Sequence, residues 1–221
     1  ERHKSDPRDA LLLARYLAHE APKLRLYEPQ SAAARELWTL LTRRATAVES
    51  CKRVRQSFLG TGISIQALRS EYRKVLKRID RRMEALIDAC GWQQSYQFCL
   101  SIPGIGPSNA TALVAAFHRG AFSSQDAFIA YLGMDVRTRE SGTYKGKRKL
   151  TKKGPSELRR LLYCAAIAGR SYEPFARYHQ RQLDKGLPKI AANCILARKL
   201  ARLAFVLMSR QENFKKGAVA Y

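Results

Sequence analysis

The chain has few acidic residues for its length. It carries 18 Asp and Glu against 41 Lys and Arg, so its 221 residues have a formal charge of +23. A charge this positive favours a polyanionic partner, and nucleic acid is the commonest one. An anionic membrane surface is the weaker alternative, because no segment pairs a Lys/Arg face with a Trp/Phe face.

Long apolar runs and clustered metal ligands are also missing. The apolar stretches are short and interrupted by Arg or Lys, so no membrane-spanning helix is expected. The five cysteines are odd in number and lack CxxC spacing, which argues against a disulfide framework and against zinc. We interpret them as small buried hydrophobes in a reducing compartment. The 46% of apolar residues is enough for a folded core.

Helical periodicity dominates what is present, so the sequence predicts a mainly α fold. One helix is expected from Ser5 to about His19. Two long helices, Ser31–Leu59 and Ser64–Ala89, are separated by Gly60-Thr61-Gly62 and predict an antiparallel coiled-coil arm. A compact helical domain follows from Trp92 to about Ser209, with helix starts near Ser124 and three prolines, and strand signals are almost absent. The expected domains are residues 1–30, 31–91 and 92–221, and residues 213–221 are expected to form a frayed tail.

A run of cations lies on the exposed faces predicted for the second arm helix. They are Arg69, Arg73, Lys74, Lys77, Arg78 and Arg81. Such a run either forms a solvated face or contacts nucleic acid, and both interpretations stay open.

The segment Pro103-Gly104-Ile105-Gly106 stands between two helical stretches. Two glycines around one apolar residue allow a sharp turn and expose amides at the next helix start, where a phosphate oxygen can bind. This pattern is typical of a helix-hairpin-helix motif, which grips the DNA backbone. The alternative is a tight turn in which Ile105 is a buried plug.

The most basic segment is Arg137–Arg160, with ten Lys or Arg residues against Glu140 and Glu157. Its glycine and charge content predict a loop or short hairpin that lies along a phosphate backbone and releases counterions. Ser141-Gly142 is either an ordinary turn or a hydroxyl that approaches a phosphorus atom closely. In the second case Arg137 and Arg139 would stabilise the transition state, and a base or a metal would still be needed.

Two carboxylates, Asp6 and Asp9, lie one helical turn apart near the start of the chain. On one face of a helix they could bind Mg²⁺. The alternative is ordinary helix-start chemistry, with Asp6 as cap and Asp9 in the first turn.

In their order along the chain, these segments resemble the transposases of bacterial insertion sequences related to the Piv site-specific DNA invertase. Five segments carry the resemblance: Lys4-Ser5-Asp6-Pro7-Arg8-Asp9-Ala10, Pro103–Gly106, Tyr131-Leu132-Gly133, Ser141-Gly142, and Lys152-Lys153-Gly154 with Leu158 and Arg159. Pro155 departs from the pattern, where a polar residue is expected.

The resemblance implies a RuvC-like domain with an Asp-Glu-Asp-Asp metal site, a coiled-coil arm, and a transposase domain with a serine nucleophile. Ser141 would form a phosphoserine link to DNA, and Asp6 and Asp9 would bind Mg²⁺. The expected partners are DNA and a structured guide RNA, in a dimer or tetramer and without a membrane. The residues expected to contact nucleic acid are Gly104, Ile105, Gly106, Arg137, Arg139, Lys145, Lys147, Arg148, Lys149, Lys152, Lys153 and Arg159.

One departure concerns the first Asp and the Glu of that metal site, which should precede Glu1. We therefore expect an N-terminally truncated recombinase that binds nucleic acid without cutting it, in the bacterial cytoplasm near the nucleoid. The alternative is a non-catalytic helical adaptor that grips nucleic acid by shape and charge.

Overall fold

The computed structural model describes residues 6–24, 28–137, 140–141, 144–145 and 149–215. The chain divides into two compact units, Glu1–Gln30 and Ser31–Tyr221, and each is described by itself. The first unit contains helix α1 (Asp6–Glu20) and the short 3-10 helix η1 (Ala21–Lys23). Asp6 and Asp9 lie in the first turn of α1, and its leucines are more than half exposed.

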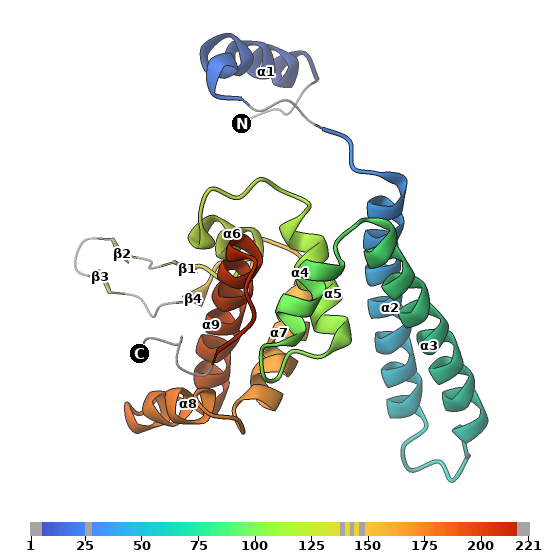
Figure 1. The fold of residues 1–221 in the computed structure, drawn as a ribbon. Coiled ribbons are helices and arrows are strands. Elements are labelled where there is room, and N and C mark those ends of the chain that lie inside the picture. Colours follow the sequence, from blue (N-terminus) through green and yellow to red (C-terminus); the bar gives the residue numbers. More distant parts are fainter. Residues whose placement is uncertain (1–5, 25–27, 138–139, 142–143, 146–148, 216–221) are drawn as a thin grey trace. The chain divides into compact units, whose positions relative to one another are not determined.

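Two long helices, α2 (Ala32–Ser57) and α3 (Gln66–Ala89), form the arm (Figure 1). Ser31 caps α2, because its hydroxyl accepts a hydrogen bond from the Ala34 amide at 3.2 Å. The connection contains Gly60 and Gly62, both with positive φ. Both helices match the sequence prediction closely.

Two ion pairs link the arm helices in addition to their apolar seam. Arg82 donates two hydrogen bonds to the Glu36 carboxylate, at 2.7 and 2.8 Å, and these lower the pKa of Glu36. Arg44 Nε donates to Asp80 at 2.6 Å. Arg82 interrupts the apolar heptad pattern of α3, and its partner on α2 explains why a cation is tolerated there.

The arm is buried only at its root. Leu37, Leu41 and Leu86 belong to the core, whereas Leu68 and Val75 are 45% and 39% exposed. Two helices can bury only the seam between them, so the distal heptad positions lack a third covering layer.

The rest of the second unit is a compact group of helices around α9 (Lys189–Arg210) (Figure 1). The others are α4 (Gln93–Leu100), α5 (Pro107–Phe117), α6 (Gln125–Tyr131), α7 (Ser156–Gly169) and α8 (Phe175–Asp184). Helices α4, α6, α7 and α8 all contact α9. Ala197, Ala201 and Ala204 of α9 are fully buried, and their small side chains allow this close approach.

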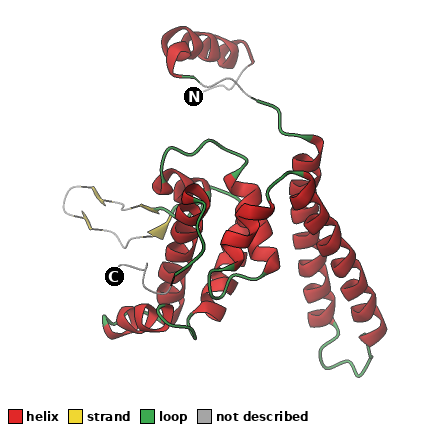
Figure 2. Cartoon of the chain, viewed as in Figure 1, coloured by secondary structure: helices red, strands yellow, loops and turns green. Residues whose placement is uncertain are grey.

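Helix starts in this region follow the signals in the sequence. The Ser124 hydroxyl caps α6 by accepting from the Ala127 amide at 3.2 Å. Pro155, Pro174 and Pro188 each occupy the position immediately before a helix. The mainly α fold class is therefore confirmed (Figure 2). None of the helices in the described ranges is long and apolar enough to cross a membrane.

Ring contacts connect the residues that follow α5 with the start of α4 and with arm helix α2. Trp92 stacks on His118 with ring centroids 4.5 Å apart, and Ser95 Oγ lies 3.1 Å from His118 Nε2. Burial lowers the pKa of His118, which favours the neutral imidazole. The Arg119 guanidinium lies 4.5 Å above the Trp38 ring of α2.

The segment between α6 and α7 contains short strands, whereas the sequence shows almost no strand signal. Strand β1 (Val136–Arg137) pairs with β4 (Lys149–Leu150), and β2 (Glu140–Ser141) pairs with β3 (Tyr144–Lys145), both antiparallel. The predicted loop or short hairpin is thus a hairpin. Its pairing depends on backbone hydrogen bonds rather than on alternating apolar side chains, which explains the weak signal.

Two expectations are wrong in part, the frayed tail from residue 213 and the burial of all five cysteines. The Phe214 amide donates to Ser101 Oγ at 2.8 Å, and its ring lies 5.7 Å from the Phe175 ring, so residues 213–215 are not a frayed tail. Residues 216–221 lie outside the described residues. Of the cysteines, Cys99 is buried, with a pKa raised by burial to about 12, whereas Cys164 is exposed.

The turn between α4 and α5 packs on α7 through direct backbone contact. Gly104 has φ +91°, and a Cβ placed on it would lie 2.5 Å from Gly169 Cα and 2.7 Å from the Ala165 carbonyl oxygen. Ile105 is 5% exposed, as the plug interpretation predicts. Gly104 therefore has a packing role, whatever else the turn does.

We predict that Gly104→Ala lowers the free energy of unfolding by about 3 kcal/mol, since it adds a left-handed backbone cost to overpacking. Gly60→Ala is the matched control, because Gly60 has a similar φ of +80° but open space around its Cβ position. It should cost only about 1 kcal/mol. Urea denaturation measures both, and equal losses would contradict the packing role.

Candidate nucleic-acid interface

The strands place Ser141 at the far end of a basic hairpin. Cα pairing runs from Val136 with Leu150 at the base to Ser141 with Tyr144, where two residues connect the strands. Ser141 and Lys145 are described by backbone only, and Arg139, Gly142, Lys147 and Arg148 lie outside the described residues. The predicted nucleophile therefore belongs to the end of the hairpin most distant from the base along the strands.

Residues on either side of the strands close the base of the hairpin. The Thr151 amide donates to the Asp135 carbonyl at 3.0 Å, and the Thr151 hydroxyl donates to the Asp135 carboxylate. One step further, the Lys152 amide donates to the Gly133 carbonyl at 3.1 Å. These bonds extend the β1–β4 ladder into the core and fix its register.

Backbone from the Tyr131–Gly133 segment packs directly against backbone from the Lys152–Gly154 segment. A Cβ on Gly154 would lie 2.3 Å from the Tyr131 carbonyl oxygen, and one on Gly133 would lie 2.8 Å from the Lys153 amide nitrogen. Lys152 itself has φ +57°, an uncommon conformation for a residue with a side chain. Two of the segments that carry the family resemblance thus meet in space and form one structural joint.

Arg159 stabilises this joint from helix α7. Its Nη1 donates to the Gly154 carbonyl at 2.8 Å and to the Leu132 carbonyl at 3.2 Å. The neighbouring Arg160 instead forms two 2.7 Å hydrogen bonds with Glu157, which raise its pKa. The sequence assigned Arg159 to nucleic-acid contact, and the structure gives it an internal role that the motif did not reveal.

Several cations around the base remain exposed to solvent. They are Arg137, Lys149, Lys152 and Lys153. They lie on both strands and on the segment that follows, so positive charge surrounds the base of the hairpin. Such a surface attracts phosphates and gains free energy when counterions are released.

The α4–α5 turn provides a second place for a phosphate. Gly106 is the N-cap of α5, and a Cβ there would meet nothing within 4 Å. Pro107 has no amide hydrogen, so the first amides at this helix start are those of Ser108 and Asn109. The geometry permits the helix-hairpin-helix contact at Gly106, whereas Gly104 and Ile105 face the protein interior.

The acidic pair belongs to a different unit of the chain from the hairpin and the α4–α5 turn. Asp6 and Asp9 belong to the first unit and Ser141 to the second, so their common site stays a prediction. Within the described parts of the chain, no three His, Cys, Asp or Glu side chains are grouped closely enough to hold a metal ion. Two carboxylates alone supply too few ligands for Mg²⁺, so they do not fit a complete site.

Comparison with known proteins shows which proteins this chain is similar to. Residues 96–180 match the family model described as Transposase IS116/IS110/IS902 family. This range begins in α4 and ends in α8, and it includes the α4–α5 turn and the whole basic hairpin.

Individual relatives agree with the family model. The pilin gene-inverting proteins of Moraxella lacunata and Moraxella bovis are each 27% identical over 226 residues, covering 97% of this chain and 69% of the relative. The transposase for insertion sequence element IS1328 of Yersinia enterocolitica is 30% identical over 156 residues, covering 67% of this chain and 46% of the transposase. The resemblance to insertion-sequence transposases and recombinases is therefore confirmed, and residues 96–180 are the part that matches the IS116/IS110/IS902 family model.

We predict different outcomes for two adjacent substitutions that each remove one positive charge. Arg159→Gln loses both carbonyl contacts, which should lower stability by about 2 kcal/mol and Tm by about 6 °C. Arg160→Gln breaks contacts within one helix, chiefly the pair with Glu157, and should shift Tm by less than about 2 °C. Calorimetry measures both. If both variants have the same Tm and only Arg159→Gln binds DNA more weakly, Arg159 instead contacts a phosphate directly.

Proposed function

We propose that the chain is the arm and serine-bearing part of a DNA transposase or site-specific recombinase. The observation that carries this proposal is the basic hairpin: the family match encloses it, and its strand pairing puts Ser141 at the far end. The relatives are transposases and gene-inverting proteins over most of this chain's length, which favours a recombinase over a non-catalytic adaptor.

Ser141 is the proposed nucleophile. Its Oγ would attack the scissile phosphorus, lose its proton, and expel one deoxyribose oxygen, so that one phosphoester bond forms as another breaks. The energy of the broken bond is kept in the phosphoserine link. In the reverse reaction the hydroxyl of another strand end attacks this link, releases the serine and completes the exchange. Arg137, exposed on β1, and Arg139 supply positive charge for the transition state.

Cleavage needs more than these residues provide. Asp6 and Asp9 would contribute two ligands for Mg²⁺, and the resemblance implies that a further Asp and Glu complete the site. Bound Mg²⁺ would supply the positive charge that activates a hydroxyl or stabilises a leaving oxygen. We propose that the 221 residues alone bind nucleic acid and do not cut it.

The expectations of a guide RNA and of an oligomer both rest on the family resemblance. The arm offers a surface on which an oligomer could form. Phe58, Leu59 and Ile63 at its distal end are 37%, 71% and 63% exposed. Exposed apolar groups of this size favour contact with another protein surface, such as a second copy. A dimer or tetramer would let the serine of one copy serve the acidic residues of another.

One prediction of the proposed function concerns how the hairpin binds DNA. Replacing Arg137, Lys149 and Lys153 with Gln should weaken binding to duplex DNA at least tenfold, and the slope of log K against log salt should fall by about 2 to 3. The matched control replaces Arg69, Arg73 and Lys77 on the exposed face of α3, which changes the net charge equally. Fluorescence anisotropy at several salt concentrations measures both. Equal losses would contradict a special role of the hairpin, because binding would then follow net charge or include the α3 face as well.

The second prediction concerns Ser141. A protein that also carries the further Asp and Glu should form a denaturant-resistant adduct with a nicked DNA substrate in Mg²⁺. Ser141→Ala should abolish the adduct, whereas Thr143→Ala and Tyr144→Phe, which remove neighbouring hydroxyls, should retain it. An adduct that persists in Ser141→Ala would refute the assignment. Cutting by the 221-residue chain alone would refute the need for further carboxylates.

A further inference from the structure

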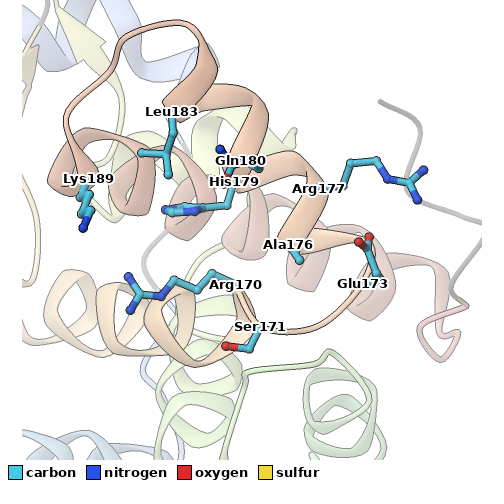
Figure 3. A pocket seen from close by; sticks show the side chains of 9 residues that line it. All are labelled: Arg170, Ser171, Glu173, Ala176, Arg177, His179, Gln180, Leu183 and Lys189. Atoms are coloured by element: carbon cyan, nitrogen blue, oxygen red, sulfur yellow. The ribbon is translucent and has the colours of Figure 1, made fainter.

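A pocket of about 660 Å³ lies where α7 ends, α8 passes and α9 begins (Figure 3). Arg170 and Ser171 follow α7, His179 and Leu183 come from α8, and Lys189 is the first residue of α9. None of these residues belongs to the basic hairpin or to the α4–α5 turn. The pocket is therefore a separate feature of the second unit.

Positive charge dominates its wall. Arg170, Arg177 and Lys189 are exposed, and Glu173 is the one carboxylate among the residues that line it. None of the three cations forms an ion pair with any described residue. In contrast, Arg44, Arg82 and Arg160 elsewhere in the unit are all paired. The pocket thus has unused capacity for an anion.

His179 gives an independent indication. Its side chain is 7% exposed, and its Nε2 is buried without a hydrogen-bond partner among the described residues. A buried polar atom left unpaired costs about 1 to 3 kcal/mol, so a partner supplied by a ligand would recover that cost. Figure 3 shows the ring directed to the side of the pocket where Arg170 and Lys189 also lie. His179, Arg170 and Lys189 all line the pocket, so a ligand held by the two cations would lie near the imidazole.

The start of α9 adds a fixed positive potential. Pro188 is its N-cap and makes no side-chain cap hydrogen bond, so the first-turn amides are not capped from that position. A helix of 22 residues carries a partial positive charge at this end. Backbone amides, guanidinium, ammonium and imidazole groups together are the donors that phosphate oxygens accept.

We propose that this pocket binds a phosphate group of nucleic acid. The phosphate chemistry follows from the pocket itself, and nucleic acid as its source rests on the proposed function. Arg170 and Lys189 would pair with the phosphate oxygens, and His179 Nε2–H would donate to one of them. The volume is ample for a phosphodiester with its flanking sugars. The second unit would then hold nucleic acid at the α7–α8–α9 pocket as well as at the hairpin and the α4–α5 turn.

Lys189→Gln and Lys185→Gln form the decisive pair of variants. Both lysines are exposed and only four residues apart, but Lys185 does not line the pocket. Lys189→Gln and Arg170→Gln should each weaken duplex DNA binding about three- to tenfold and reduce the salt slope by about 1. Lys185→Gln should weaken it less than twofold. Equal effects of Lys185→Gln and Lys189→Gln would overturn the site.

A second measurement separates this site from the proposed function. Titration with inorganic phosphate, followed by NMR of the His179 ring, should shift its resonances saturably in the unmodified chain and not in Lys189→Gln. Saturable shifts in a chain that fails to bind DNA would support the pocket and refute the nucleic-acid function. No shift, with DNA binding retained, would refute the pocket alone.

The source of the phosphate is tested with duplexes that differ only at their ends. If Lys189→Gln weakens binding equally for 5′-hydroxyl and 5′-phosphate duplexes, the pocket holds an internal phosphodiester. If it weakens binding only for the 5′-phosphate duplex, the pocket holds a terminal phosphate. Either result supports a phosphate site. If Lys189→Gln leaves the affinity for both duplexes unchanged, the site is refuted.

Discussion

Direct contact of backbone with backbone, made possible by glycine, is the constraint on which the second unit depends. It occurs where Gly104 meets Gly169 and where Gly154 meets the Tyr131 carbonyl. The first contact seats the α4–α5 turn on α7, and the second seats the base of the basic hairpin beside α6. In both places a methyl group would overlap atoms that cannot move aside, because they belong to packed backbone. All four glycines, Gly133 included, lie within the range that matches the transposase family model.

The helices could be predicted from the sequence because local signals determine them. Ser31 and Ser124 cap their helices as the pattern indicates, and prolines stand directly before α7, α8 and α9. Burial along the arm could not be predicted in the same way. A heptad pattern shows which positions face a neighbouring helix, and it does not show whether a third layer covers them. For the same reason the docking of Phe214 on the core escaped the sequence, since its partners Ser101 and Phe175 are far away in the chain.

Part of the candidate site could likewise be predicted from the sequence, and part could not. A basic segment with Ser141 and the Pro103–Gly106 turn are visible as composition and spacing. The internal role of Arg159 could not be predicted, because its hydrogen-bond acceptor is a backbone carbonyl, which every residue type has. A lysine-and-arginine count treats every cation as available, although Arg159 and Arg160 already have partners. The pocket of α7, α8 and α9 was missed because Arg170, His179 and Lys189 come together only in the folded chain.

These observations suggest a division of labour within the hairpin. Its base is held by glycine packing, by the Asp135–Thr151 contacts and by Arg159, so the direction in which the strands leave the core is well defined. Under the proposed function its far end meets a DNA backbone, and a nucleophile on a helix of the core would be kept at a distance by the surrounding side chains. A two-stranded extension solves this problem, since its own backbone hydrogen bonds carry a serine beyond the core. The closely packed joint at Gly133 and Gly154 is then as important for placing Ser141 as the residues around the serine itself.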